Sequence, residues 1–183
     1  MKNKKIKVFV DVFYFRAAGA GIRTYISELC RGLKKHGHRN IQYVFSHDIE
    51  KKNSNSIYLN SHNRFIRWIF QLHYLIWKQI ILPIKINFDR IDYIISPDFL
   101  MPIWVLKAQK ICVIHDTFFW DHPKNYSFLW RIFFTKMITA GIDKKTTIVT
   151  TSNFSKKNIK RVLNVNNEVK VIYQSSSIIE SKI

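Results

Sequence analysis

Histidine and aspartate stand side by side in the stretch KICVIHDTFFWDHP, residues 110–123. His115 and Asp116 follow directly after 110–114, an apolar run that predicts a buried strand. An imidazole at the end of such a strand can donate a hydrogen bond to a sugar hydroxyl or a phosphate, or it can act as a general acid or base. A histidine that simply packs in the core is an equally good interpretation of these residues alone.

Other residues that could do chemistry form weaker patterns. Asp121 and His122 repeat the pairing in an aromatic stretch that we expect to be a mobile loop, and for them we favour a structural role. Cys30 and Cys112 lack CxxC spacing, which argues against a zinc site or a disulfide framework. Two buried thiols fit a reducing cytosol. The sequence contains no nucleophile elbow, P-loop or HExxH motif.

A run of small residues, AAGAGIRTY (17–25), joins the first predicted strand to the first predicted helix. Gly19, Ala20 and Gly21 would let a phosphate approach the backbone, and the N-terminus of the helix offers free N–H groups and a favourable dipole. Arg23 could add a charge-assisted contact. The spacing departs from GxGxxG, so the dinucleotide fingerprint is absent, and an ordinary tight turn is the alternative.

Strands and helices alternate along the chain. Short β-branched runs predict strands, and apolar residues three and four apart predict helices. The expected strands are 6–12, 41–46, 57–59, 92–96, 110–114, 146–151 and 169–173. The expected helices are 22–33, 64–85, 128–142 and 154–163. This order predicts an α/β fold, a Rossmann-like parallel sheet with helices on both faces, in which ligands bind beyond the carboxyl ends of the strands.

The segment 64–85 is unusual because its polar residues form one narrow stripe on a helix. The stripe consists of Arg64, Arg67, Gln71, Lys78 and Lys85. Such a helix is either deeply buried or lies in a membrane interface with its cations outward. We favour packing on the sheet for most of its apolar face, and we expect Pro83 to end or kink the helix.

The formal net charge is +18, from 30 Lys and Arg against 12 Asp and Glu, and the excess lies at both ends of the chain. It indicates either an anionic partner, such as a nucleotide or an anionic membrane surface, or a coding bias toward Lys, Asn and Ile. Nucleic acid is not expected, because the aromatic residues occupy core-like positions. The N-terminus does not predict a signal peptide, since Asp11 interrupts its apolar run. No stretch predicts a transmembrane span.

Several local motifs, in order along nearly the whole chain, carry a resemblance to a known family. They are GAGIRTYISEL (19–29), WKQIILP (77–83), DYIISPDFLMP (92–102), VIHDTFFWDHPKNYS (113–127) and TTIVTTSNFSKKNIKRVLNVNNEVKVIY (146–173). In order and spacing they are similar to motifs of the N-terminal domain of family 4 glycosyltransferases with the GT-B fold. That group includes glycogen-synthase-like and mannosyltransferase-like enzymes.

The resemblance implies one half of a GT-B fold, the acceptor-side domain of an enzyme that transfers a sugar in the cleft between two domains. It implies a nucleotide-sugar donor, a cell-surface glycan or lipid-linked acceptor, retention of configuration, and no metal or other cofactor. His115 would approach the donor sugar, and Asp116 would fix its surroundings or cap the following turn. The loop 19–21 would approach the diphosphate. Three further residues would lie near the cleft: Ser152, Asn153 and Ser155.

The chain departs from the family pattern after the last predicted strand, where VIYQSSS (171–177) lacks the Pro and Gly of the family's V-I-P-N-G-V. We expect residues 1–174 to form the acceptor-side domain and 175–183 to begin an interdomain linker, with no donor domain in residues 1–183. Activity would then require a separately encoded donor domain. The alternative is a non-catalytic truncated remnant or a basic membrane-surface binding module. We expect a place in polysaccharide biosynthesis, in the cytoplasm, with the inner face of the cell membrane as a candidate site of peripheral attachment.

Overall fold

The computed structural model describes residues 5–49 and 64–174, which contain one six-stranded parallel sheet in the order β2-β1-β3-β4-β5-β6. The strands are β1 (Ile6–Val10), β2 (Ile41–Phe45), β3 (Tyr93–Ser96), β4 (Gln109–Val113), β5 (Thr147–Thr150) and β6 (Val169–Val171). β1 pairs with β2 on one side and with β3 on the other, so the strand order reverses at β1. Open α/β sheets bind ligands beyond the carboxyl ends of the strands at such a point.

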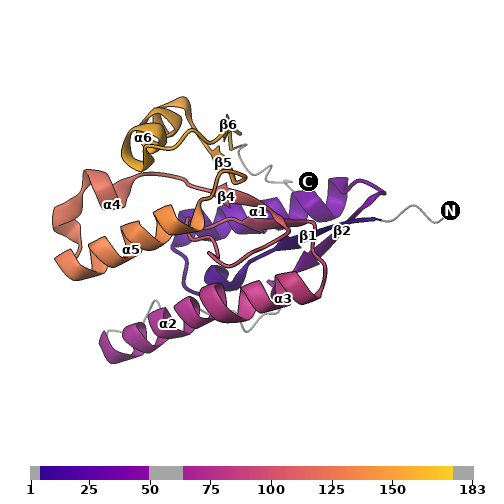
Figure 1. The fold of residues 1–183 in the computed structure, drawn as a ribbon, viewed down its shortest axis with the longest axis horizontal. Helices are drawn as coiled ribbons and strands as arrows, with labels where there is room; N and C mark the ends of the chain where they lie inside the picture. The colour runs from indigo at the N-terminus through magenta and orange to yellow at the C-terminus, as the bar shows by residue number, and fades with distance from the viewer. Residues whose placement is uncertain (1–4, 50–63, 175–183) are drawn as a thin grey trace, which may run out of the picture.

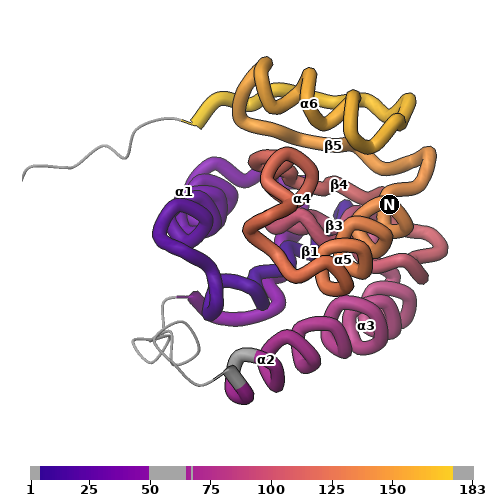
Figure 2. The backbone as a smooth tube through the Cα atoms, turned by 90° about the vertical axis from the view of Figure 1, so that its left-hand side faces the viewer, coloured from indigo at the N-terminus to yellow at the C-terminus, as the bar shows by residue number. Residues whose placement is uncertain are grey.

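Helices lie on both faces of this sheet (Figure 1). The longer ones are α1 (Ala20–His36), α2 (Arg64–Ile76), α3 (Leu82–Phe88), α5 (Phe128–Gly141) and α6 (Asn153–Leu163). The short ones are η1 (Phe13–Arg16), the π-helical turn η2 (Trp77–Ile81), α4 (Phe118–Asp121) and η3 (Pro123–Asn125). α2, η2 and α3 follow one another without a break, and we call them the long rod. Figure 2 shows α1 on one side of the strands and the long rod with α5 on the other.

The alternation of side chains along β1 builds a core on each face. Val8 and Val10 pack with Ile26 and Cys30 of α1 in one hydrophobic cluster. Phe9, which points the opposite way, belongs to a larger cluster under the long rod, α5 and α6. Both clusters are buried, as the two-residue period of a strand covered on both faces requires.

The structure confirms the predicted Rossmann-like α/β fold. Every predicted strand and helix among the described residues forms, with ends that shift by a few residues. Ser152 caps α6, because its Oγ accepts a hydrogen bond from Ser155 N at 3.0 Å. The short helices η1, α4 and η3 were not predicted from the sequence. The predicted strand 57–59 and the expected linker 175–183 lie outside the described residues.

The long rod departs in part from the prediction for 64–85. The helix does not end at Pro83, which sits in the first turn of α3, and an irregular π-helical turn directly precedes it. Lys78, expected on an outward cationic stripe, is fully buried against the sheet. The rod packs on the sheet through Phe70, Leu82 and Ile86, while a second row of apolar residues on its opposite side is exposed. Lys78 turns inward because its ammonium group pairs with two buried carboxylates at the strand ends.

Candidate functional site at the carboxyl edge of the sheet

His115 lies just beyond the end of β4, is half-buried, and contacts residues on two sides. Its Nε2 lies 3.2 Å from the carbonyl oxygen of Pro97. Because a carbonyl oxygen only accepts, Nε2 must donate, which leaves Nδ1 as the acceptor of the neutral ring. The ring also meets Tyr25 of α1 edge to face, with centroids 4.6 Å apart. The histidine is therefore held in one orientation by β3's end and by α1.

Burial lowers the pKa of His115 below its ordinary value of 6.5, against the opposing effects of the Pro97 hydrogen bond and the charge of Asp116. The imidazole is accordingly neutral near pH 7, and it can accept a hydrogen bond at Nδ1. This is the protonation state in which a histidine can bind a sugar hydroxyl through its unprotonated nitrogen.

Asp116 and Asp121 both make contacts that hold the local structure. Asp116 Oδ1 accepts a hydrogen bond from Phe118 N at 3.0 Å, which caps the turn that follows His115. Asp121 accepts from the Thr117 hydroxyl and forms an ion pair with Arg161 of α6 at 2.6 Å. The aromatic stretch is thus a short helix, α4, tied to α6, and the expectation of a loop there is wrong. The structural role favoured for Asp121 agrees with these contacts.

The N-terminus of α6 is joined to the end of β4 by a short relay of hydroxyl groups. Ser152 Oγ lies 3.0 Å from Ser155 Oγ, and Ser155 Oγ donates to the backbone oxygen of His115 at 2.9 Å. Asn153 points away from this relay, and its side-chain amide donates to the Tyr173 hydroxyl at 2.9 Å. The two serines therefore lie at the candidate site, whereas Asn153 ties α6 to the segment after β6.

The glycine loop lies beside the same edge. Gly19 is the N-cap of α1, and a Cβ placed on Gly19 or on Gly21 would meet nothing within 4 Å. Neither glycine has a positive φ, so neither is required by the fold. Arg23 packs over the ring of Phe15 at 5.0 Å. The open space in front of the helix N-terminus is the arrangement that an anion could use.

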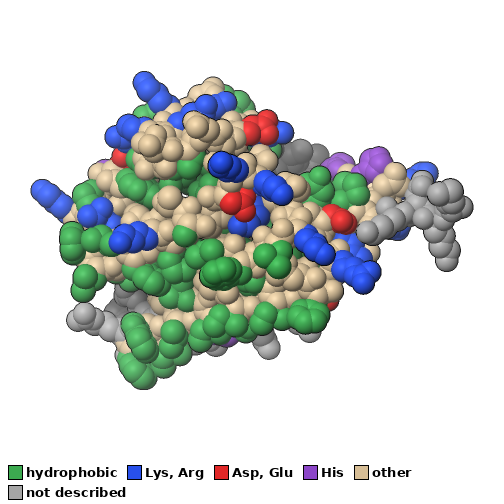
Figure 3. Space-filling view, in the orientation of Figure 1, with side chains coloured by type: hydrophobic (Ala, Val, Ile, Leu, Met, Phe, Trp, Pro, Cys, Tyr) green, Lys and Arg blue, Asp and Glu red, His purple; other side chains and the backbone are tan. Residues whose placement is uncertain are grey.

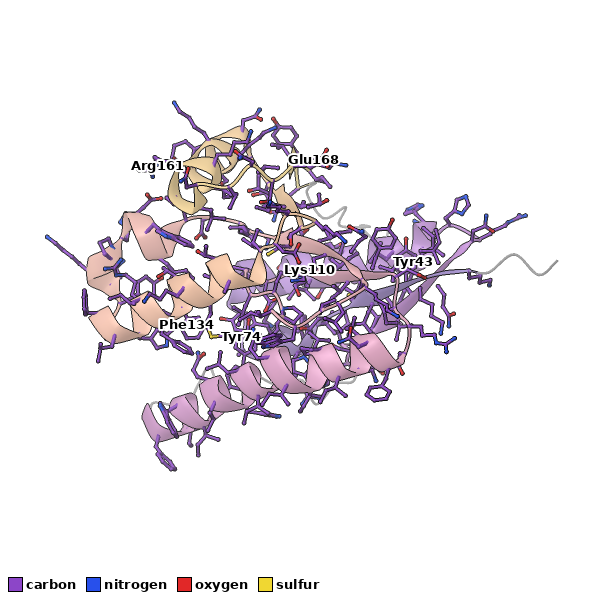
Figure 4. All side chains as sticks on the ribbon, viewed as in Figure 1. Tyr43, Tyr74, Lys110, Phe134, Arg161 and Glu168 are labelled. Carbon is purple, nitrogen blue, oxygen red and sulfur yellow. The ribbon has the colours of Figure 1, made fainter. Side chains whose placement is uncertain are left out.

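A pocket of about 290 Å³ opens next to His115 and Asp116. It lies between η1, the first turn of α1, α2, α4 and α5, and most of its lining is aromatic. The lining residues besides those two are Tyr14, Ile22, Gln71, Tyr74, Phe99, Ile114, Phe118, Phe119, Trp120, Tyr126, Trp130, Phe134 and Ile138. Tyr74 and Phe134 lie close together between the long rod and α5 (Figure 4). A mainly apolar pocket with a few polar groups at one end is typical of small-molecule sites.

A larger hollow, about 390 Å³, lies beside α1, and four of its lining residues are Cys30, Arg31, Lys34 and Lys35. It contains none of the residues at the strand ends. We therefore place the candidate site at the smaller pocket, where an oriented histidine at the carboxyl edge of a parallel sheet meets Ile22 in the first turn of α1.

A second group of charged side chains at this edge was missed by the sequence analysis. Lys78 Nζ lies 2.7 Å from Asp98 Oδ1, 2.8 Å from Asp11 Oδ2 and 3.2 Å from Ser96 Oγ. The contact with Asp11 is an ion pair without the direction of a good hydrogen bond. All three charged groups are buried, with at most 1% of each side chain exposed. We call Asp11, Lys78 and Asp98 the buried triad.

Aromatic residues of the long rod complete the hydrogen bonds of this triad. Trp77 Nε1 donates to Asp11 Oδ1 at 3.0 Å, and the Tyr74 hydroxyl donates to Asp98 Oδ2 at 2.5 Å. Trp77 and Lys78 are consecutive, yet both contact Asp11, at the start of the π-helical turn. Local widening of a helix of this kind re-aims side chains.

Burial and charge set the ionisation of the triad. Burial opposes ionisation of Asp11, but the charge of Lys78 and the hydrogen bonds that Asp11 accepts hold its pKa below the ordinary value. Burial raises the pKa of Asp98 despite the same lysine. Burial also disfavours the charged form of Lys78, and the two carboxylates more than reverse this and raise its pKa. The lysine is thus a fixed cation that no solvent reaches.

A signal for the triad was present in the sequence. Asp11 follows β1 directly, and Asp98 follows β3 within two residues, so the topology brings both carboxylates to the point where the strand order reverses. Two carboxylates at one buried position require a cation. Lys78, which lies in a mainly apolar helix, could therefore have been predicted from the sequence as the counter-charge of these two carboxylates.

Within 5–49 and 64–174, no group of three or more His, Cys, Asp or Glu side chains is arranged to hold a metal ion. Among the described helices, none combines the length and the apolar character that crossing a bilayer demands.

Comparisons with known proteins agree with this architecture. A search of curated proteins finds no match. The family model for Glycosyltransferase Family 4 matches residues 19–175, which include the glycine loop, His115 and the cap of α6. A match of this extent, on a six-stranded parallel sheet that corresponds to one half of a GT-B fold, establishes that the chain belongs to glycosyltransferase family 4.

Proposed function

We propose that the chain is the acceptor-side domain of a retaining glycosyltransferase, which transfers a sugar from a nucleotide-sugar to a cell-surface glycan or a lipid-linked acceptor. Membership of the family supports glycosyl transfer in general. The observation that supports this particular role is the pocket at His115, which has an aromatic body and its polar groups at one end. Such a pocket is suited to an acceptor with a sugar ring or a lipid-linked portion.

In this proposal His115 orients the donor sugar. Its Nε2–H is committed to Pro97 O, so a sugar hydroxyl would donate to the free Nδ1. The Ser155 hydroxyl holds the backbone of His115, and Asp116 caps the turn behind it. These contacts fix the position of the ring, which is the condition for an orienting role.

The diphosphate would lie in front of the glycine loop. The free N–H groups at the start of α1 would stabilise the negative charge that develops on the leaving group, and Arg23 stands one turn away. We propose that this stabilisation replaces a metal ion. Transfer is then expected to be unchanged by a chelator such as EDTA, and a loss of transfer that Mg²⁺ or Mn²⁺ restores would contradict it.

The donor-binding half of the enzyme would be supplied by a second domain. Two buried thiols, Cys30 and Cys112, lie in the two separate clusters on opposite faces of the sheet. They fit a reducing compartment, and we propose the cytoplasm. The second candidate is a non-catalytic module that keeps the pocket and transfers nothing, which the departure at VIYQSSS (171–177) favours.

The test is a transfer assay with a panel of nucleotide-sugars, performed with the chain alone and with the product of the adjoining reading frame. Turnover or binding only in the mixture supports a split glycosyltransferase. Turnover by the chain alone would overturn the need for a second domain. No binding in either case, with a folded chain, favours the non-catalytic module.

A further inference from the structure

The long rod exposes a continuous apolar surface to solvent. Nine of its large apolar side chains are between 38% and 82% exposed, and we call them the outer apolar face: Phe65, Trp68, Ile69, Leu72, Ile76, Ile80, Ile81, Ile84 and Phe88. They recur three or four residues apart and so lie along one side of the rod. Figure 3 shows hydrophobic side chains as a row along the lower edge, where the long rod lies in Figure 1. The rod is roughly 35 Å long at 1.5 Å per residue.

The rod is apolar on two sides. Its inner side packs on the sheet through Phe70, Leu82 and Ile86, and it also turns Lys78 into the buried triad. A water-soluble helix normally packs one apolar side on the core and presents a polar side to solvent. The triad thus holds one side of the rod against the sheet and leaves a second apolar side outside. Isolated exposed apolar residues are common, but a continuous row of this length indicates an interaction surface.

The apolar face continues onto a neighbouring loop. The Asn87 side-chain amide donates to the Trp104 backbone oxygen at 3.2 Å, and its carbonyl oxygen accepts from Leu106 N at 3.2 Å. This loop presents Trp104 and Leu106 with 69% and 77% of their surface exposed. Trp68 on the rod and Trp104 on the loop are thus both largely exposed to solvent. Tryptophan is enriched where proteins meet the headgroup region of a bilayer.

Charge at this surface favours an anionic partner. The segment 64–88 contains no Asp or Glu. Lys85, Arg90 and Lys107 are exposed at the α3 end of the rod. The acidic residues nearest to these cations in the chain are Asp89 and Asp92, and both contact Lys7. The Asp89 backbone oxygen accepts from Lys7 Nζ, and the Asp92 carboxylate accepts from Lys7 N.

We infer that the outer apolar face docks the protein onto the surface of an anionic lipid bilayer, with the rod parallel to the membrane plane. The apolar side chains would enter the boundary between headgroups and acyl chains, and the cations at the α3 end would lie among anionic headgroups. A bilayer fits better than a protein partner, because the face is a convex helix flanked by cations and carries tryptophan at its margins. α2 also supplies Gln71 and Tyr74 to the pocket, so the pocket would lie beside the membrane.

This inference does not depend on sugar transfer, and its test needs no donor or acceptor. The whole chain is sedimented with vesicles of phosphatidylcholine alone and of an equimolar mixture with phosphatidylglycerol, at low and at high salt. We expect binding to the mixed vesicles, weaker binding to the neutral ones, and partial loss in high salt. Absence of binding to the mixed vesicles would overturn the proposal, as would complete loss in high salt, which would indicate charge attraction alone.

The matched variants separate the apolar face from net charge. Ile80→Glu with Ile84→Glu should lower vesicle partitioning at least about tenfold, since both side chains would enter the interface. Phe154→Glu with Ile172→Glu changes the charge equally at two exposed apolar residues of α6 and the segment after β6, and it should retain most binding. Equal losses in both pairs would contradict the assignment of this face.

A second measurement guards against a variant that fails to fold. Brominated lipids in the mixed vesicles should quench part of the tryptophan fluorescence of the wild type, and Trp68→Phe should remove a large share of that quenching. Unchanged quenching in Trp68→Phe would overturn the docking geometry. A different set of results would assign the face to a second copy of the chain instead. The wild type would then self-associate without binding vesicles, and the variant with Ile80→Glu and Ile84→Glu would be monomeric.

Discussion

The buried triad and the His115 pocket both lie at the carboxyl edge of the sheet, one at the ends of β1 and β3 and the other at the end of β4. The triad is closed, because Trp77, Lys78 and Tyr74 of the long rod fill the space and contact both carboxylates. The pocket is open. The Nε2 of its histidine donates to Pro97 O, which leaves Nδ1 to accept a hydrogen bond from a ligand.

The difference shows that a titratable side chain after a buried strand is not by itself evidence of a catalytic or binding role. Asp11 and Asp98 lie at the point where open sheets commonly bind ligands. Here the side chain of Lys78 fills the space that a ligand would take. His115 is one strand further along, beside a hollow. On this account the triad contributes orientation of the rod and specificity of the fold, and the pocket contributes function.

The largest effect is expected from removal of the cation of the triad. Lys78→Met leaves two buried carboxylates without a counter-charge, which typically costs about 3–5 kcal/mol of unfolding free energy. The measurement is urea denaturation at pH 7. The loss should shrink as the pH falls, because the unpaired carboxylates can then take up protons.

Lys85→Met on the same rod is the control, since Lys85 is exposed. We expect it to change the unfolding free energy by less than about 1 kcal/mol. Equal effects of the two substitutions would contradict the view that the triad, and not the rod's charge in general, stabilises this edge.

The pocket is expected to respond in activity and not in stability. His115→Ala should lower sugar transfer, measured with the donor-binding partner present, by about 100-fold, as loss of a positioned histidine commonly does. The unfolding free energy should fall by only about 1 kcal/mol, for the lost hydrogen bond to Pro97. His122→Ala is the matched control, because His122 is exposed and lies outside the pocket lining. Full transfer by His115→Ala would remove the histidine from the mechanism.

The glycine loop offers a smaller and cleaner comparison within one helix. Gly21→Ala and Gly32→Ala both add a methyl group that meets nothing within 4 Å, so neither should reduce stability. Only Gly21 lies at the N-terminus where the diphosphate is proposed to approach, and Gly21→Ala should weaken nucleotide-sugar binding about tenfold by blocking that approach. Titration calorimetry compares the two, and equal affinities would place the diphosphate elsewhere.

The pH dependence should be the smallest effect. The pKa values of His115 and His47 are both lowered in the fold, chiefly by burial. Below the ordinary value of 6.5 the unfolded chain binds more protons than the native one, so stability is fully present above that pH and is lost as the pH falls through it. Thermal unfolding between neutral and mildly acidic pH measures this. His115→Gln should reduce the slope, and an unchanged slope would mean that His115 is not a buried neutral imidazole.

Local patterns predicted most of the fold and part of the site. The end of β4 and the start of α1 each depend on a few neighbouring residues, and the structure confirms both predictions. The triad depends on three segments far apart in the sequence. A helical period groups Gln71 and Lys78 on one side of a helix, but it does not tell which side faces the sheet. That orientation was decided by Asp11 and Asp98, whose proximity follows from the strand order.

The measurement that tests the central claim most directly is a map of backbone amide chemical shifts in the isotope-labelled chain. A nucleotide-sugar is added with the unlabelled donor-binding partner present, and the shifts are compared with those caused by the partner alone. The account predicts that the amides of Gly19, Gly21 and His115 move, while those of Asp11, Lys78 and Asp98 stay in place. Movement centred on the triad, or on the hollow beside α1, with the His115 pocket unchanged, would contradict it.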